Sequence, residues 1–211
     1  LGCTAMTLLA LVLYLVALVM LFGVRSWVQR RQTGSTGYRG ISGRPLSAEW
    51  TGGVLFIVSI ALGVAGPLLA VTGTVPTDAS TGVQVVGLVV ALVGFAATLA
   101  GQIGMGASWR VGVDPTERTD LVTSGAFALV RNPVFTAMVT AQLGVALMVP
   151  TWVSALALLT LIVAVELQVR VVEEPYLRRI QGAVYEDYCA RVGRFVPGIG
   201  RTRGAPPVAG A

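Results

Sequence analysis

Four ionisable side chains gather where the last long apolar segment of the chain ends. The segment "VELQVRVVEEPY" (165–176) holds them at steps of four, three and one: Glu166, Arg170, Glu173 and Glu174. On a helix, residues three and four apart are neighbours, so these groups are expected near one face. Ionisable groups at a membrane boundary are costly unless they pair or line a polar cavity. The segment is either a helix end whose charges reach the membrane surface, or one wall of a polar pocket for a cationic ligand.

A second polar motif, "RNPVF" (131–135), opens another apolar segment. Asn132 is a good helix cap and Pro133 suits the first helical position, so a helix is predicted to begin there. The unpaired N–H groups of a helix start bind anions, and Arg131 adds positive charge. Locally, the motif fits either a capped helix with an arginine on the cytoplasmic side or an anion-binding site.

An expected helical hairpin brings the two motifs together. The apolar segments 134–149 and 152–169 are separated only by Pro150 and Thr151. A two-residue turn makes the two helices antiparallel, so the ends that carry the motifs must be neighbours. The hairpin therefore predicts one site where a helix start faces a carboxylate cluster. A ligand with a carboxylate and a cationic centre, such as S-adenosylmethionine, suits that arrangement.

The composition places these motifs in a membrane protein. Of 211 residues, 55% are hydrophobic and only 12% are charged, whereas about a quarter of the residues of a soluble domain are charged. Three further apolar segments, 4–24, 51–71 and 83–103, are each near the roughly 20 residues that cross a bilayer as a helix. We therefore predict an all-α bundle of five transmembrane helices, of which the hairpin forms the last two.

The charged residues predict the orientation of this bundle. All fifteen basic residues are arginines, and they avoid both the 72–82 loop and the hairpin turn. Because positive loops face the cytoplasm, the N-terminus is predicted outside a bacterial-type inner or plasma membrane and the C-terminus inside. A net charge of +5 in such a chain indicates anchoring to membrane lipids rather than nucleic-acid binding. The chain has no histidine, which excludes a histidine base or histidine metal site.

The chain is expected to divide into three parts. Residues 1–103 hold three apolar segments and would face the lipid and an acceptor. Residues 104–197 hold the hairpin and both polar motifs. Within that part, 174–195 has one apolar and one polar face, which predicts a cytoplasmic amphipathic helix that Pro197 ends. Residues 198–211 have the composition of a flexible tail.

Several blocks, taken in order, resemble the isoprenylcysteine carboxyl methyltransferase-like family of integral membrane methyltransferases. The blocks are "SWRVGV" (108–113), "LVTSGAFALVRNPVF" (121–135), "RVVEE" (170–174), "GAVYEDY" (182–188) and "RFVP" (194–197). Their order and spacing are similar to the family's Arg-His-Pro-x-Tyr before a hairpin and Arg-x-x-Glu-Glu after it. Asn132 stands where the family usually has histidine, and Phe135 where it often has tyrosine. A proton-transfer role of that histidine would be absent here.

The resemblance implies a methyltransferase that uses S-adenosylmethionine and acts on a lipophilic molecule or lipid that enters from the bilayer. It implies that the cofactor site is bordered by Arg131, Asn132, Pro133, Phe135, Glu173, Glu174, Tyr185 and Tyr188. The residues expected to take part in catalysis are Arg170, Glu173 and Glu174. Either glutamate could take the proton of an amine acceptor.

Two other interpretations fit the same features. A membrane reductase of the sterol-reductase kind resembles this family in its final helices but uses NADPH. A small channel or assembly subunit would use its arginines only as anchors, and would tolerate alanine at Arg131, Glu173 and Glu174.

Overall fold

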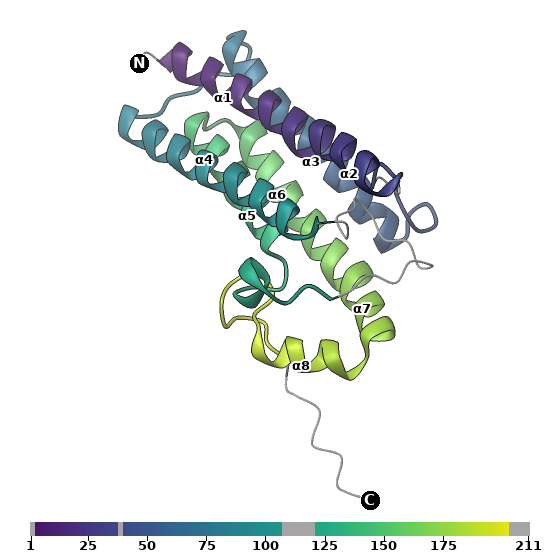
Figure 1. Ribbon diagram of the computed structural model, residues 1–211. Coiled ribbons are helices and arrows are strands. Elements are labelled where there is room, and N and C mark those ends of the chain that lie inside the picture. The colour runs from purple at the N-terminus through teal and green to yellow at the C-terminus, as the bar shows by residue number, and fades with distance from the viewer. Residues whose placement is uncertain (1–2, 38–39, 107–120, 203–211) are drawn as a thin grey trace, which may run out of the picture.

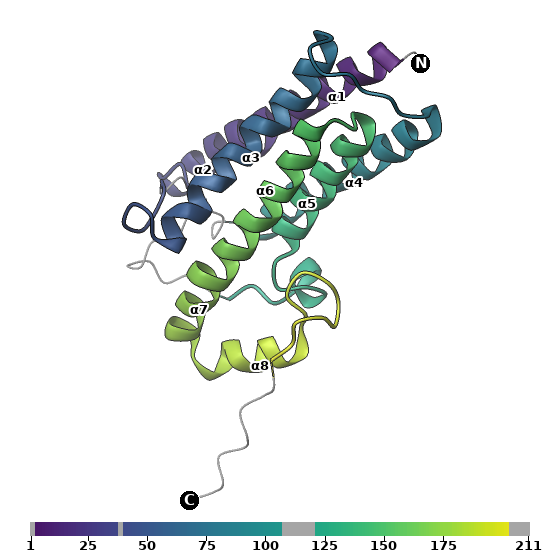
Figure 2. The ribbon, with the colours of Figure 1, turned by 180° about the vertical axis from the view of Figure 1, so that it is seen from behind.

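The computed structural model describes residues 3–37, 40–106 and 121–202. These residues form an elongated bundle of helices with a smaller unit at one end (Figures 1 and 2). That smaller unit, which we call the terminal cap, consists of residues 121–132 and 182–202. Within the described ranges the protein is all-α, and its β-structure is limited to an isolated parallel bridge between Val130 and Gly193, inside the terminal cap.

Long apolar helices build the N-terminal part of the bundle. Their bounds are α1 (Cys3–Leu18), the π-helical segment η1 (Val19–Val24), α2 (Arg25–Thr33), α3 (Ala48–Val71) and α4 (Thr81–Gly104). The first three run on as one rod, because η1 joins α1 to α2 without a break. Ser47 and Ser80 cap α3 and α4, since each hydroxyl accepts a hydrogen bond from a backbone N–H of the first turn.

The predicted hairpin is present. It consists of α5 (Pro133–Met148) and α6 (Trp152–Leu167), and Thr151 caps α6 by accepting a hydrogen bond from Ser154 N. α6 then continues through a second π-helical segment, η4 (Gln168–Glu173), into α7 (Glu174–Gln181). The polar motif after the hairpin therefore lies on the continuation of α6, past the level at which α5 begins.

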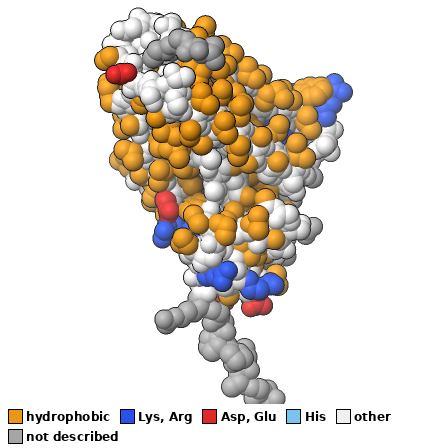
Figure 3. Space-filling view, turned by 90° about the vertical axis from the view of Figure 1, so that its left-hand side faces the viewer, with side chains coloured by type: hydrophobic (Ala, Val, Ile, Leu, Met, Phe, Trp, Pro, Cys, Tyr) orange, Lys and Arg blue, Asp and Glu red, His pale blue; other side chains and the backbone are white. Residues whose placement is uncertain are grey.

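The long helices have the length and composition of membrane spans. Among the described residues, four helices qualify: Thr4–Thr33, Ala48–Val71, Thr81–Gly104 and Trp152–Gln181. α5 is apolar but has 16 residues, which is about 24 Å at 1.5 Å per residue. Figure 3 shows apolar side chains over the broad middle of one face, with charged side chains mainly toward its ends. The predicted all-α membrane bundle is confirmed, whereas a fifth crossing stays a prediction.

Small residues allow α4 and α5 to pack with their backbones in contact. A Cβ added at Gly94 would overlap the backbone N of Ala141, and one added at Gly144 would overlap that of Ala91. Helices in membranes associate through such close approaches, because lipid gives little driving force for burying apolar side chains. α6 packs against α3 in turn. The hairpin is thus fixed between α4 and α3.

The predicted single helix over 174–195 is wrong, because the chain bends at Gly182. α7 ends at Gln181, and α8 (Ala183–Arg191) begins on the other side of the bend. Gly182 has φ +52°, a conformation that glycine adopts at low cost. The bend turns α8 across the end of the bundle (Figure 2). α8 also stops before Pro197, since residues 192–202 form a loop in the terminal cap.

We expect Gly94→Ala to lower the melting temperature of the detergent-solubilised protein. The added methyl group meets the backbone of α5, and overpacking of this kind costs about 1–3 kcal/mol. Gly104→Ala is the matched control in the same helix, because a Cβ there meets no atom within 4 Å. Equal melting temperatures for the two variants would contradict the close packing of α4 on α5.

Candidate functional site

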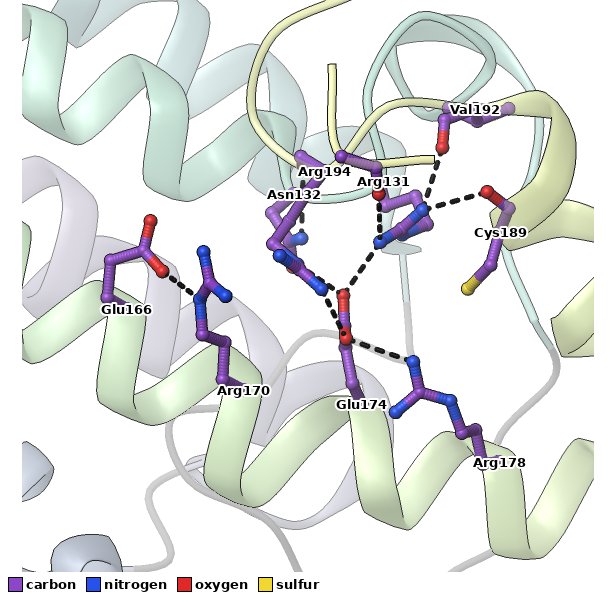
Figure 4. A network of polar contacts seen from close by, with 10 residues as sticks. Arg131, Asn132, Glu166, Arg170, Glu174, Arg178, Cys189, Val192 and Arg194 are labelled. Atoms are coloured by element: carbon purple, nitrogen blue, oxygen red, sulfur yellow. Dashed lines mark hydrogen bonds and ion pairs between the residues drawn. The ribbon is translucent and has the colours of Figure 1, made fainter. Parts of the chain in front are cut away.

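A buried carboxylate, Glu174, is the centre of a polar network at the end of the bundle (Figure 4). Its Oε1 accepts hydrogen bonds from Arg131 Nη2 at 2.8 Å and from Arg194 Nε at 2.6 Å. Its Oε2 accepts from Arg194 Nη2 at 2.9 Å and from Arg178 Nη2 at 3.2 Å. Hydrogen bonds between charged groups are the strong ones. One carboxylate therefore ties together guanidinium groups from the start of the hairpin, from α7 and from the C-terminal loop.

Arg131 uses the rest of its guanidinium to hold the terminal cap. Its Nη1 donates to the carbonyls of Cys189 and Val192 at 3.1 and 2.8 Å, and its Nη2 also donates to Gly200 O at 3.2 Å. Its backbone N donates to Gly193 O at 2.8 Å. The side chain is only 1% exposed. Arg131 thus anchors the end of α8 and the loop after it to the start of the hairpin.

Asn132 stands at the start of α5, but its side chain does not cap the helix. Pro133 is the first helical residue, as predicted. The Asn132 Nδ2 donates to Arg194 O at 3.1 Å and makes no capping bond. Asn132 therefore occupies the N-cap position, as predicted, but its side chain does not make the capping bond, because the C-terminal loop takes that side chain instead. The N–H groups of Val134 and Phe135 consequently begin α5 without a capping side chain.

The four ionisable groups after the hairpin do not form one cluster. Glu166 and Arg170 form an ion pair one helical turn apart, and both side chains are exposed. Figure 4 shows this pair on the same helix as Glu174, beside Arg194. Glu173 ends η4 and is half-buried. Glu174 joins the network around Arg131.

The two tyrosines of the predicted site lie in the interior of the terminal cap. Tyr185, Tyr188 and Cys189 form a buried cluster on α8. The Tyr188 hydroxyl donates to Phe127 O at 2.6 Å, which links α8 to the 3-10 helix η3 (Gly125–Ala128). Burial raises the pKa of Tyr188 to about 12, and it also raises the pKa of Tyr185 and of the Cys189 thiol. All three groups are therefore neutral near pH 7.

Phe135, another predicted site residue, lies within the bundle rather than in the polar network around Glu174. Phe135 packs against the apolar cluster of Leu161, Val165 and Val169, between the two hairpin helices. The block 108–113 lies outside the described residues.

Sequence reasoning missed two members of the network, Arg178 and Arg194. Arg178 follows Glu174 by four residues on α7, which is the spacing of a helical ion pair. Arg194 opens the block "RFVP". The hydrogen bonds with Glu174 raise the pKa of Arg194 above its ordinary value, so Arg194 is charged at any physiological pH. The helical spacing was a usable signal for Arg178. Arg194 reaches Glu174 only through the folding of the loop, which has no such pattern.

Comparison with known proteins agrees with this arrangement. A family model for phospholipid methyltransferases matches residues 83–184, from α4 through the hairpin to the start of α8. The match confirms the resemblance to the isoprenylcysteine carboxyl methyltransferase-like membrane methyltransferases, the group that includes the matched family. The fold and the match together support a membrane methyltransferase, and they give no support to a reductase. No curated protein matches the chain.

We expect Glu174→Gln to open the terminal cap and expose Cys189. The substitution leaves the guanidinium of Arg131 buried without its counter-charge, which costs about 3–5 kcal/mol. In a Cys3→Ser background Cys189 is the only thiol. Its rate of modification by a maleimide, measured in detergent, should rise by more than about tenfold.

Glu166→Gln in the same background is the matched control. It removes a carboxylate from an exposed pair on the same helix, and exposed pairs contribute about 0–1 kcal/mol. The labelling rate should stay at that of the parent protein. A Glu174→Gln protein whose thiol is as protected as the control would show that the network does not hold the cap.

Proposed function

We propose that the protein is an S-adenosylmethionine-dependent methyltransferase that acts on a lipophilic acceptor drawn from the bilayer. The observation that carries the proposal is the ion pair between Arg131 and Glu174, at 2.8 Å, within a segment that matches a methyltransferase family. It joins the two polar ends of the hairpin at one end of an apolar bundle. When bound, S-adenosylmethionine supplies a methyl group on a sulfonium, and transfer of that group depends mainly on positioning and exclusion of water.

The groups at the end of the hairpin fit the charged ends of this cofactor. The uncapped N–H groups of Val134 and Phe135 start a 16-residue helix, and such helix starts bind carboxylates. Arg194 lies beside them, because its carbonyl accepts a hydrogen bond from Asn132, and its side chain is 16% exposed. We assign the carboxylate end of the cofactor to these groups.

A carboxylate is the natural partner of the cationic end of the cofactor or of an amine acceptor. Both oxygens of Glu174 accept hydrogen bonds from guanidinium groups, so Glu174 is a weak base and a poor ligand. We therefore assign Glu174 a positioning role. Glu173, its neighbour at the end of η4, is our candidate for contact with the cationic centre and for removal of a proton from an amine acceptor. Arg170 stays assigned to the edge of this site, paired with Glu166.

The proposal includes an orientation in the membrane. The arginine distribution favours an outer N-terminus and a cytoplasmic terminal cap, which is the side where S-adenosylmethionine is made. α5 would then be a fifth crossing, although it covers about 24 Å of a hydrocarbon layer of about 30 Å. Its close packing against α4 supports this, because neighbouring helices can shield the ends of a short span.

We expect the purified protein in detergent to bind S-adenosylmethionine in isothermal titration calorimetry. Glu173→Gln should weaken binding by about 10- to 100-fold, because a hydrogen bond to a charged group contributes about 1.5–3 kcal/mol. Glu186→Gln is the control, since it removes an exposed carboxylate on α8 that is not assigned to the site. NADPH, titrated in parallel, should give no saturable heat.

The protection of Cys189 from maleimide shows that each sample is folded before titration. A folded wild-type protein that binds no S-adenosylmethionine would overturn the proposal. Saturable binding of NADPH would replace it with the reductase. If wild type and Glu173→Gln bind S-adenosylmethionine with equal affinity, the cofactor assignment stands but the role of Glu173 is refuted.

A further inference from the structure

One exposed stripe follows α6 from its first residue into the polar motif after the hairpin. Its members lie four and three residues apart, which is the spacing of one helix face. They are Trp152, Leu156, Leu159, Val163, Glu166 and Arg170. The first four are exposed apolar side chains, and the last two form the exposed ion pair described above. The stripe is therefore apolar for most of its length and ends in two opposite charges.

The size of the apolar side chains favours lipid as the neighbour of this stripe. Where α4 meets α5, the two helices approach closely through glycine and alanine. Interfaces between membrane helices generally favour such small residues. The stripe instead presents tryptophan, leucine and valine, which would hold a second helix at a distance. Lipid chains can fill the space around such side chains, so we take lipid, and not a second copy of the chain, as the occupant.

The ion pair lies at a depth where an undistorted bilayer would be apolar. Trp152 is 68% exposed and begins α6, and tryptophan is enriched at the boundary between lipid and water. Glu166 lies 14 residues beyond Trp152, about 21 Å along the helix, whereas the hydrocarbon layer is about 30 Å thick. Charged residues of membrane helices normally face the bundle interior. This pair faces outward, with side chains that are 38% and 57% exposed, so it requires a polar neighbour from the membrane.

The pair has hydrogen-bonding atoms left for such a neighbour. Arg170 Nε donates to Glu166 Oε2. Among the described residues, Arg170 Nη1 and Nη2 and Glu166 Oε1 make no further hydrogen bond (Figure 4). The planar fork of a guanidinium group matches two oxygens of a phosphate. The carboxylate oxygen beside it can accept from the ammonium or hydroxyl group of a lipid headgroup.

We propose that Glu166 and Arg170 bind the headgroup of a phospholipid, with the phosphate on Arg170 and the acyl chains along Leu159 and Val163. This lipid lies deeper than its neighbours, so the bilayer is thinned beside the hairpin. Lipid bilayers thin around charged groups and around short spans, and α5 is a short span of 16 residues in the same hairpin.

The position of the pair gives the bound headgroup a functional setting. Figure 4 shows Glu166 and Arg170 beside Arg194, which we assign to the cofactor site. A headgroup on the pair would therefore lie next to that site, at the end of the hairpin. The inference does not rest on methyl transfer, because it holds for a lipid neighbour whether or not that lipid is an acceptor.

Depth-dependent fluorescence quenching tests the proposal. Bimane is attached to Val163→Cys in a Cys3→Ser background, in which Cys189 is buried, and the protein is placed in phosphatidylcholine nanodiscs. Val163 lies 11 residues from Trp152, about 16.5 Å, which is close to the middle of an undistorted hydrocarbon layer. Separate nanodiscs carry a nitroxide on the choline headgroup or at the end of an acyl chain. We expect the headgroup nitroxide to quench this bimane, because Glu166 is its neighbour on the same helix face.

Val93→Cys is the matched control near the middle of α4. Its side chain is also exposed, and α4 carries no charged residue. The headgroup nitroxide should quench bimane there weakly, whereas the chain nitroxide should quench it strongly. Arg170→Gln should reduce headgroup quenching at position 163 to the level at position 93. Protection of Cys189 from maleimide shows that each variant is folded.

Three results would each overturn the proposal. Equally weak headgroup quenching at positions 163 and 93, with Arg170 present, would mean that the pair draws no headgroup toward it. Headgroup quenching at position 163 that persists in Arg170→Gln would mean that another feature thins the bilayer. Shielding of position 163 from both nitroxides would show that a second copy of the chain covers the stripe.

Discussion

Arg131 and Glu174 are 43 positions apart in the chain, and both charged groups are almost completely removed from solvent. Neither can be buried alone, because an unpaired charge in such a place costs far more than the pair contributes. Their contact requires that α5 start beside the point where α6 has passed through η4 into α7. It also requires the C-terminal loop, whose Arg194 binds the same carboxylate. The hairpin and the terminal cap are therefore one cooperative unit.

This constraint separates two roles within a short motif. Glu174 faces inward and is held by three arginines, while its neighbour Glu173 is the last residue of η4 and is half-buried. The inward carboxylate fixes the geometry, and the other is the one to which we assign contact with a ligand. The same division applies to the hairpin start. Arg131 and the Asn132 side chain bind the loop, which leaves the backbone N–H groups of α5 uncapped.

The sequence predicts most of the bundle, because apolar length and a two-residue turn determine long helices and a hairpin. It also places Arg131 near Glu174, since the hairpin makes their ends neighbours. It does not predict the bend at Gly182, because a glycine within a helical pattern adopts a positive φ only when tertiary contacts favour it. The sequence also does not predict the partner of Asn132. The loop around Arg194 has no periodic pattern, so only the tertiary structure shows that the Asn132 side chain binds this loop and does not cap α5.

Methyl transfer to a lipophilic molecule is the central claim, and one measurement tests it most directly. The purified protein is incubated with host lipid extract and S-adenosylmethionine that carries a radiolabelled methyl group, and the extract is then separated by chromatography. The account predicts label in one lipophilic species, dependent on the wild-type protein and strongly reduced with Glu173→Gln. A folded protein that binds the cofactor yet leaves every lipophilic species unlabelled would contradict it.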